Sequence, residues 1–270
     1  MDVLQAILLG LLQGLTEFLP ISSSGHLVLA RNLLDQPLMQ GVTFEVVVHF
    51  GTLCSIVVYY ASDIAKLFKS AFRAIGKPTQ VGSQFKADSD LRMVVFILWS
   101  MIPALIIGLT LEDYIESHLM TTTSVGIMLL VTGMLLMATN WLSKENRNLG
   151  WGNSLGVGLA QAFAILPGVS RSGSTISMGL FLGLPRDQIA NFSFLMVIPV
   201  IAGAMLLKIF EMMETGISLD AVWVLVAGFF TAFISGYFAL VYLIKILKSG
   251  GIYWFAIYCW LIGLLALILG

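Results

Sequence analysis

The sequence contains little charge. Only 11% of its 270 residues are Asp, Glu, Lys or Arg, while 58% are hydrophobic. Soluble domains carry roughly 25% charged residues, so this deficit excludes an ordinary soluble protein and indicates a membrane protein. No dense basic patch accompanies the net charge of −1, so we expect no nucleic-acid partner.

Cysteine is almost absent. Cys54 and Cys259 lie in two separate apolar segments, which excludes a disulfide framework and a cysteine-based metal site. The sequence also lacks a histidine cluster and a Walker-type phosphate loop, so neither zinc nor ATP is expected.

Long apolar runs dominate instead. Six of them approach the roughly 20 residues that a helix needs to cross a bilayer: residues 46–61, 93–111, 124–142, 194–210, 221–244 and 252–269. Their hydrophobicity does not alternate as in barrel strands, and backbone in lipid must satisfy its own hydrogen bonds. The sequence therefore predicts an all-α polytopic membrane protein, with residues 1–270 in a single membrane domain.

Two similar polar stretches interrupt the apolar pattern. Residues 13–26 read QGLTEFLPISSSGH and residues 161–175 read QAFAILPGVSRSGST. Each has a Gln, then Leu-Pro, then a Ser-x-Ser-Gly core. The similarity indicates a duplication, with one repeat in residues 1–145 and the other in residues 150–270.

Each polar stretch carries a helix-breaking proline, Pro20 or Pro167, beside Ser and Gly. Irregular backbone at membrane depth is tolerated only where protein buries it or where it lines a wet cavity. We therefore expect re-entrant helical hairpins at roughly residues 2–34 and 152–185. A kinked spanning helix in each place is the alternative.

Each repeat then holds one hairpin and three transmembrane helices, so the two repeats have inverted topology. The long connection from Asp63 to Asp90, expected as a polar loop, is basic, whereas residues 112–118 and 211–220 are acidic. The positive-inside rule places the basic connections in the cytoplasm. Both termini then lie outside, the first hairpin enters from outside and the second from inside.

The hairpins bring together groups suited to phosphate. Gln13 and Glu17 are four residues apart and share one helix face. The serine run can cap the helix after Pro20, and Ser170, Ser172 or Ser174 can cap the helix of the second hairpin. Two helix N-termini aimed at one point make an anion site.

The neighbouring side chains extend this chemistry. Arg171 offers a planar fork for phosphate oxygens, and Gly25 and Gly173 allow close approach of the backbone. Glu17, with Gln13, can hold a divalent cation or can instead take a proton from a nucleophile. Ser23 or His26 is that nucleophile, or either positions a water molecule.

Structural roles compete with these assignments. Glu17 and Arg171 can form an ion pair that only stabilises the fold, and serines in membrane helices often bond neighbouring helices. Glu45 and His49 share one face at the start of an apolar run. They either support the site from behind or lie at the membrane interface.

At these residues the chain resembles the undecaprenyl-diphosphate phosphatases of the bacitracin-resistance type. The first family signature is an acid or amide, an acid four residues later, then Pro and a Ser-rich turn ending in Gly-His, present here from Gln13 to His26. The second is Pro-Gly-x-Ser-Arg-Ser-x-x-Thr, present from Pro167 to Thr175. The resemblance runs nearly end to end and implies a fold of inverted repeats with two re-entrant hairpins.

The resemblance implies hydrolysis of undecaprenyl diphosphate to the monophosphate and inorganic phosphate, which recycles the lipid carrier of cell-wall synthesis. It implies a requirement for Mg²⁺ or Ca²⁺ and a location in the bacterial inner membrane, with the active site facing the outer side. Homo-oligomers are possible. A transporter or flippase for a phosphorylated polyprenyl lipid is the alternative, because inverted repeats with a mid-membrane site are typical of transporters.

Residue by residue, the resemblance implies catalytic roles for Glu17, Ser23, His26 and Arg171, and a metal site at Glu17 and Gln13. Family members often carry Glu where this chain has Gln13, so the carboxylate pair is absent here. The substrate-binding set that we expect is Gln13, Ser22, Ser24, Gly25, Ser170, Ser172, Gly173 and Thr175.

Overall fold

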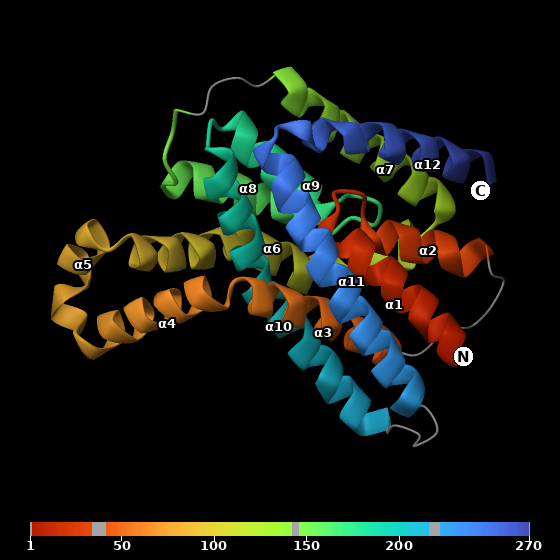
Figure 1. The fold of residues 1–270 in the computed structure, drawn as a ribbon, viewed down its shortest axis with the longest axis horizontal. Coiled ribbons are helices and arrows are strands. Elements are labelled where there is room, and N and C mark those ends of the chain that lie inside the picture. Colours follow the sequence, from red (N-terminus) through yellow and green to blue (C-terminus); the bar gives the residue numbers. More distant parts are fainter. Residues whose placement is uncertain (1, 34–41, 142–145, 216–221, 270) are drawn as a thin grey trace.

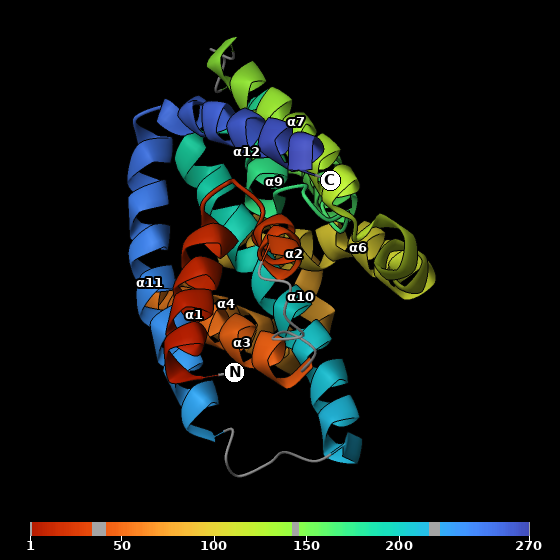
Figure 2. The same ribbon diagram turned by 90° about the vertical axis from the view of Figure 1, so that its right-hand side faces the viewer.

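The computed structural model describes residues 2–33, 42–141, 146–215 and 222–269, and within these ranges all regular structure is helical (Figures 1 and 2). The all-α prediction is confirmed. The α-helices are α1 (Val3–Phe18), α2 (Ser23–Leu33), α3 (Val42–Tyr59), α4 (Ala61–Gly76), α5 (Val81–Ala87), α6 (Ser89–Leu119), α7 (Thr122–Ala138), α8 (Trp151–Phe163), α9 (Arg171–Phe181), α10 (Arg186–Thr215), α11 (Val222–Lys248) and α12 (Phe255–Leu269). Short 3₁₀ helices are η2 (Pro78–Gln80), η3 (Thr139–Trp141) and η5 (Gly251–Trp254).

Among the described residues, four helices are long and apolar enough to cross a membrane, and a bent pair raises the number to five. The four are Ser89–Leu111, Thr122–Trp141, Val222–Lys248 and Gly251–Ile268, and the pair is Phe44–Tyr59 with Ala61–Gly76. Six spans were expected. The expected span at 194–210 lies in α10, whose first half is enclosed by protein: Phe192, Phe194 and Met196 are fully buried.

Both polar stretches form helical hairpins, as expected (Figure 1). Helix α1 ends at Phe18, because Pro20 cannot continue it, and α2 begins at Ser23 and runs away from the turn. Helix α8 ends at Phe163 and α9 begins at Arg171. The chain therefore reverses at both prolines, and the alternative of one kinked helix at each place is wrong.

The prediction of a polar loop from Asp63 to Asp90 is wrong. This segment contains α4, η2 and α5, which we call the arm (residues 61–87), and the arm lies with the start of α6 at the left of Figure 1, where both project from the other helices. Helix α4 forms because its charged and apolar residues recur at helical spacing. The acidic residues 112–118 likewise continue α6 and form no loop.

Close helix contacts position the two hairpins. Helix α1 packs along α11, where Gly10 lies against the backbone of Gly228. Helix α8 packs along α6, where Gly158 lies against the carbonyl group of Ser100. Small residues let helix backbones approach in this way. Each hairpin is thus held by a long helix of the other half of the chain.

We expect Gly158→Val to destabilise the protein, because a Cβ at this position meets the Ser100 carbonyl group and forces α6 and α8 apart. Overpacking typically costs about 1–3 kcal/mol, which corresponds to a loss of roughly 2–12 °C in the melting temperature. The measurement is thermal unfolding of purified protein in detergent. The matched control is Gly152→Ala in the same helix, where an added Cβ meets nothing within 4 Å. Equal melting temperatures for the two variants would contradict this packing.

Candidate functional site

The tip of the first hairpin is a strained turn. Ser22 has a φ of 70°, in the left-handed region that residues other than glycine seldom occupy. Its hydroxyl accepts a hydrogen bond from the Gly25 backbone N–H at 3.3 Å. Such strain persists where the surrounding structure holds it and is often found at functional sites. The turn places Ser23 at the first position of α2, next to the end of α1.

The tip of the second hairpin is held by α7. Thr132 donates to the carbonyl oxygen of Gly168 and accepts from the backbone N–H of Ser170, both at 3.1 Å. Gly168 has a φ of 94° and lies against the backbone of Val125, so a side chain there meets both strain and a clash. Of the three serines expected as caps, Ser170 caps α9, accepting from the Gly173 N–H.

The two tips touch each other. The Ser172 hydroxyl donates to the carbonyl oxygen of Phe18 at 2.9 Å, and a Cβ at Gly173 would lie 3.3 Å from Pro20. The red and green turns accordingly meet near the centre of Figure 1, and Figure 2 shows the same crossing from the side. The predicted convergence of the two polar stretches is confirmed.

Glu17 lies at the centre of this contact and is only 8% exposed. Its Oε1 accepts from Arg171 Nη2 of α9 at 2.6 Å. Its Oε2 accepts from Ser23 Oγ of α2 at 2.8 Å and from Gln13 Nε2 of α1 at 2.9 Å. One carboxylate therefore joins both hairpins, and the buried charge of Arg171 is compensated.

Two buried polar atoms of this cluster have no hydrogen-bonding partner among the described residues: Gln13 Oε1 and Arg171 Nη1. The first is an acceptor and the second a charged donor. Buried polar groups are nearly always satisfied in folded proteins. These two atoms are therefore available to a ligand that offers both positive and negative groups, such as a phosphate with its cation.

His49 is a fourth contact of Glu17. Its Nε2 lies 3.9 Å from Glu17 Oε2, while its Nδ1 lies 2.8 Å from the carbonyl oxygen of Glu45. The sequence left His49 either behind the site or at the membrane interface, and the structure places it beside the site. The four-residue spacing of Glu45 and His49 was the only signal in the sequence. The packing of α3 near α1 is what shows that His49 lies beside Glu17.

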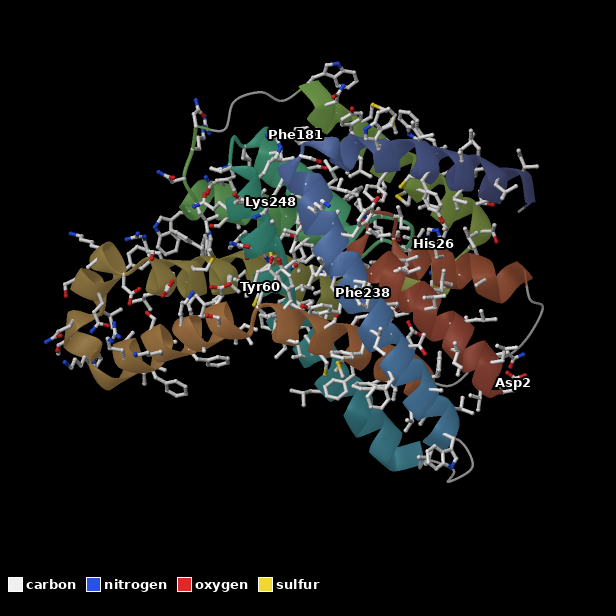
Figure 3. All side chains as sticks on the ribbon, viewed as in Figure 1. Asp2, His26, Tyr60, Phe181, Phe238 and Lys248 are labelled. Carbon is white, nitrogen blue, oxygen red and sulfur yellow. The ribbon has the colours of Figure 1, made fainter. Side chains whose placement is uncertain are left out.

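His26 is held away from the carboxylate. Its Nδ1 lies 2.8 Å from the carbonyl oxygen of Ser22, and its Nε2 lies 2.8 Å from the hydroxyl of Tyr258 on α12, with the two rings stacked. His26 thus lies on the side of α2 that faces α12 (Figure 3). Tyr258 was not predicted as a site residue, because it lies 232 residues from His26 in the sequence and no motif surrounds it.

The remaining expected residues lie in or behind the tips. Thr175 bonds within its own helix and to the hydroxyl of Ser193 on α10, at 2.6 Å, so it braces α9 from behind. Ser24 lies beside Ser22, with 3.4 Å between their hydroxyls. Gly25 packs against Gly168 of the other tip. Their roles in substrate binding stay predictions.

A metal ion at this site would depend on few protein ligands. The described residues contain no group of three or more His, Cys, Asp or Glu side chains that could hold one. The oxygen donors at the site are the unpartnered amide oxygen of Gln13 and the carboxylate of Glu17, which also bonds Arg171 and Ser23. Oxygen donors suit Mg²⁺ and Ca²⁺, which often complete their coordination with phosphate or water. The residues present therefore fit a cation that arrives with a phosphorylated ligand.

Comparison with known proteins agrees with this site. The family model described as bacitracin resistance protein BacA matches residues 6–265. A protein of Desulforapulum autotrophicum named undecaprenyl-diphosphatase is 41% identical, covering 100% of this chain and 99% of its own length. Proteins of the same name from Halothermothrix orenii and Salinibacter ruber are 40% and 39% identical, over 100% and 97% of this chain and 98% and 97% of their own lengths. The chain therefore belongs to the family of the bacitracin resistance protein BacA.

Proposed function

We propose that this protein hydrolyses undecaprenyl diphosphate to undecaprenyl phosphate and inorganic phosphate. The relatives of about 40% identity carry the name of this activity over nearly the whole chain. The observation that carries the proposal structurally is the buried cluster of Glu17, Ser23 and Arg171 between two helix N-termini. It combines a nucleophile, a proton acceptor and a phosphate-binding fork in a membrane protein.

Arg171 and the backbone bind the terminal phosphate in this proposal. The free Nη1 of Arg171 donates to a phosphate oxygen, and the N-termini of α2 and α9 add backbone N–H groups and partial positive charge. These groups are already in place before the substrate arrives. Preorganised donors of this kind are the main contribution that proteins make to phosphoryl transfer.

Ser23 is the nucleophile that the geometry favours, since its hydroxyl already donates to Glu17 at 2.8 Å. Its Oγ attacks the terminal phosphorus as Glu17 takes the hydroxyl proton. The bond between the terminal phosphorus and the bridging oxygen breaks, and undecaprenyl phosphate leaves with that oxygen. Water then attacks the phosphorus of the phosphoserine, the bond between phosphorus and Ser23 Oγ breaks, and inorganic phosphate departs while Ser23 takes back the proton that Glu17 holds.

His26 has a positioning role in this scheme. Its ring bonds the carbonyl oxygen of Ser22 and the hydroxyl of Tyr258, so it holds the strained turn that presents Ser23. A divalent cation, Mg²⁺ or Ca²⁺, held by Gln13 and Glu17 would neutralise phosphate charge when bound.

We further propose that the two halves are inverted repeats and that the catalytic site opens to the outer face of the inner membrane. The swapped packing supports this arrangement, since α1 lies along α11 while its counterpart α8 lies along α6. The start of α1 and the end of α12 lie toward the right of Figure 1, and six spans with two re-entrant hairpins would place both termini on one side of the membrane. The basic arm then lies in the cytoplasm.

Purified protein in detergent is expected to release phosphate from a polyprenyl diphosphate in the presence of Mg²⁺ or Ca²⁺, and EDTA should abolish the release. Arg171→Ala should lower the rate by at least about 10²-fold, because removal of one preorganised electrostatic group typically costs ~2.7–4 kcal/mol. Arg147→Ala, at an exposed position, is the matched control and should keep the wild-type rate. Vectorial movement of lipid in liposomes without any hydrolysis would instead make the protein a transporter.

Ser23→Ala should abolish turnover and leave no trapped intermediate, whereas His26→Ala should slow the reaction and still form a phosphoserine. The difference follows because only Ser23 contacts Glu17, while His26 acts through the turn. Rapid quenching with labelled substrate and mass spectrometry of the tip peptide measure the intermediate. A phosphohistidine at residue 26, or turnover by Ser23→Ala, would contradict the proposed nucleophile.

A cysteine at position 152 tests the topology. Gly152 is exposed, with open space for a side chain, and lies at the start of the second hairpin. In intact cells, an impermeant thiol reagent should leave Gly152→Cys unlabelled, and labelling should appear after permeabilisation, with the wild-type protein as the blank. Labelling in intact cells would place this hairpin on the outer side.

A further inference from the structure

The arm, residues 61–87, leaves the helical body at the level where aromatic residues gather. Helix α4 bends by 80° from α3 directly after Tyr59 and Tyr60. Nearby, Phe85 of the arm stacks on Trp151, whose ring also contacts Phe96 and Trp99. Tyr and Trp are enriched where a membrane meets water. A sharp bend next to clustered aromatic residues is typical of a helix at a membrane surface.

One face of α4 is an uncovered apolar ridge. Phe68, Phe72 and Ile75 are 61%, 68% and 74% exposed, and the rings of Phe68 and Phe72 stack on each other. Soluble surfaces seldom expose large apolar side chains in such a group. The ridge is continuous along about two turns of the helix, so it presents one apolar surface.

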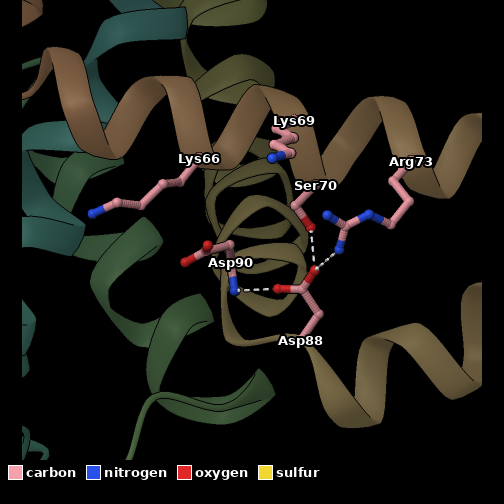
Figure 4. Close-up of a pocket in the computed structure, with 6 residues that line it drawn as sticks. All are labelled: Lys66, Lys69, Ser70, Arg73, Asp88 and Asp90. Atoms are coloured by element: carbon pink, nitrogen blue, oxygen red, sulfur yellow. Dashed lines mark hydrogen bonds and ion pairs between the residues drawn. The ribbon is translucent and has the colours of Figure 1, made fainter.

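The opposite face of α4 is basic. Lys66, Lys69 and Arg73 follow each other at helical spacing and point into an open hollow against the start of α6 (Figure 4). The hollow is completed by Ser70, Asp88 and Asp90. The segment from residue 62 to residue 92 holds six basic and three acidic residues in a chain of net charge −1. The arm therefore carries a net positive charge, whereas the rest of the molecule has a net negative charge.

The nearby acids offset only part of this positive charge. Asp88 accepts from the Ser70 hydroxyl at 2.7 Å and from the Asp90 and Leu91 backbone N–H groups. These hydrogen bonds, led by that from Ser70, lower the pKa of Asp88. Asp88 also lies 3.5 Å from Arg73, while Lys66 pairs with Asp63 on its own helix. Lys69 meets no acid among the described residues.

We propose that the arm binds the surface of an anionic phospholipid leaflet, with Phe68, Phe72 and Ile75 among the acyl chains and Lys66, Lys69 and Arg73 attracting the lipid phosphates. An interfacial helix has this division between an apolar face and a Lys/Arg-rich face. Charge complementarity selects this occupant, because a second copy of the arm would bring like charges together. The contact lies outside the catalytic site and selects the surrounding lipid.

The first experiment compares two double variants with equal loss of charge. The proteins are extracted from mixed liposomes, and native mass spectrometry measures the lipids that stay bound. Wild-type protein should retain phosphatidylglycerol in preference to phosphatidylcholine. The control variant Lys245→Gln/Lys248→Gln, changed at the basic end of α11, should show the same preference. Lys69→Gln/Arg73→Gln should lose the preference by roughly 10–30-fold, since each basic side chain near an anionic surface is worth about a five-fold change in affinity. The preference should also fall with added salt. Phosphate release in detergent should stay unchanged in both variants.

The second experiment locates the ridge with a fluorescent probe attached at Phe72→Cys or at Lys69→Cys in liposomes. We expect doxyl-labelled lipid to quench the probe at position 72 and aqueous iodide to quench the probe at position 69. An unchanged lipid preference in Lys69→Gln/Arg73→Gln, or iodide quenching at position 72, overturns the proposal. Protection of position 72 from both quenchers, with crosslinking between arms, would assign the ridge to a second copy of the chain.

Discussion

The buried ion pair between Glu17 and Arg171 is the interaction on which the rest of the structure depends. The two residues are 154 positions apart, and each lies at the tip of a different hairpin. A buried charge without its partner typically costs about 3–5 kcal/mol. Neither tip can therefore exist alone in its observed form, and the glycine contacts of α1 with α11 and of α8 with α6 serve to bring the two tips together.

The same pair connects the structure to the chemistry. In the resting protein, Glu17 binds Arg171, Ser23 and Gln13 at once, so the charges are satisfied without a substrate. In the mechanism that we propose, a phosphate that binds Arg171 withdraws part of that compensation from Glu17. The carboxylate then becomes a better acceptor for the Ser23 proton at the moment when the phosphorus is near. The proposed mechanism thus couples substrate binding to the activation of Ser23, while the contacts of His26 with Ser22 and Tyr258 hold the turn in place.

Several elements could be predicted because their causes are local. Pro20 ends α1, the four-residue spacing of Gln13 and Glu17 places them on one face, and Ser170 caps α9. The helices of the arm were not predicted, because the low mean hydropathy of this segment was interpreted as a sign of a loop. Its charged and apolar residues nevertheless alternate at helical spacing. The helix expected at 194–210 is present within α10, whose first half is covered by protein, and its crossing of the membrane stays a prediction.

The sequence by itself determined the helical membrane class, the two hairpins and the chemical types at their tips, because length, hydrophobicity and helix breaking act over a few neighbouring residues. Only the tertiary structure decided which partner each group meets: His49 beside Glu17, Tyr258 beside His26, and Ser172 against the end of α1. These contacts join residues far apart in the chain, and they follow from how the helices pack against one another. Local composition carries no information about such distances, so the geometry of the site appears only in the folded molecule.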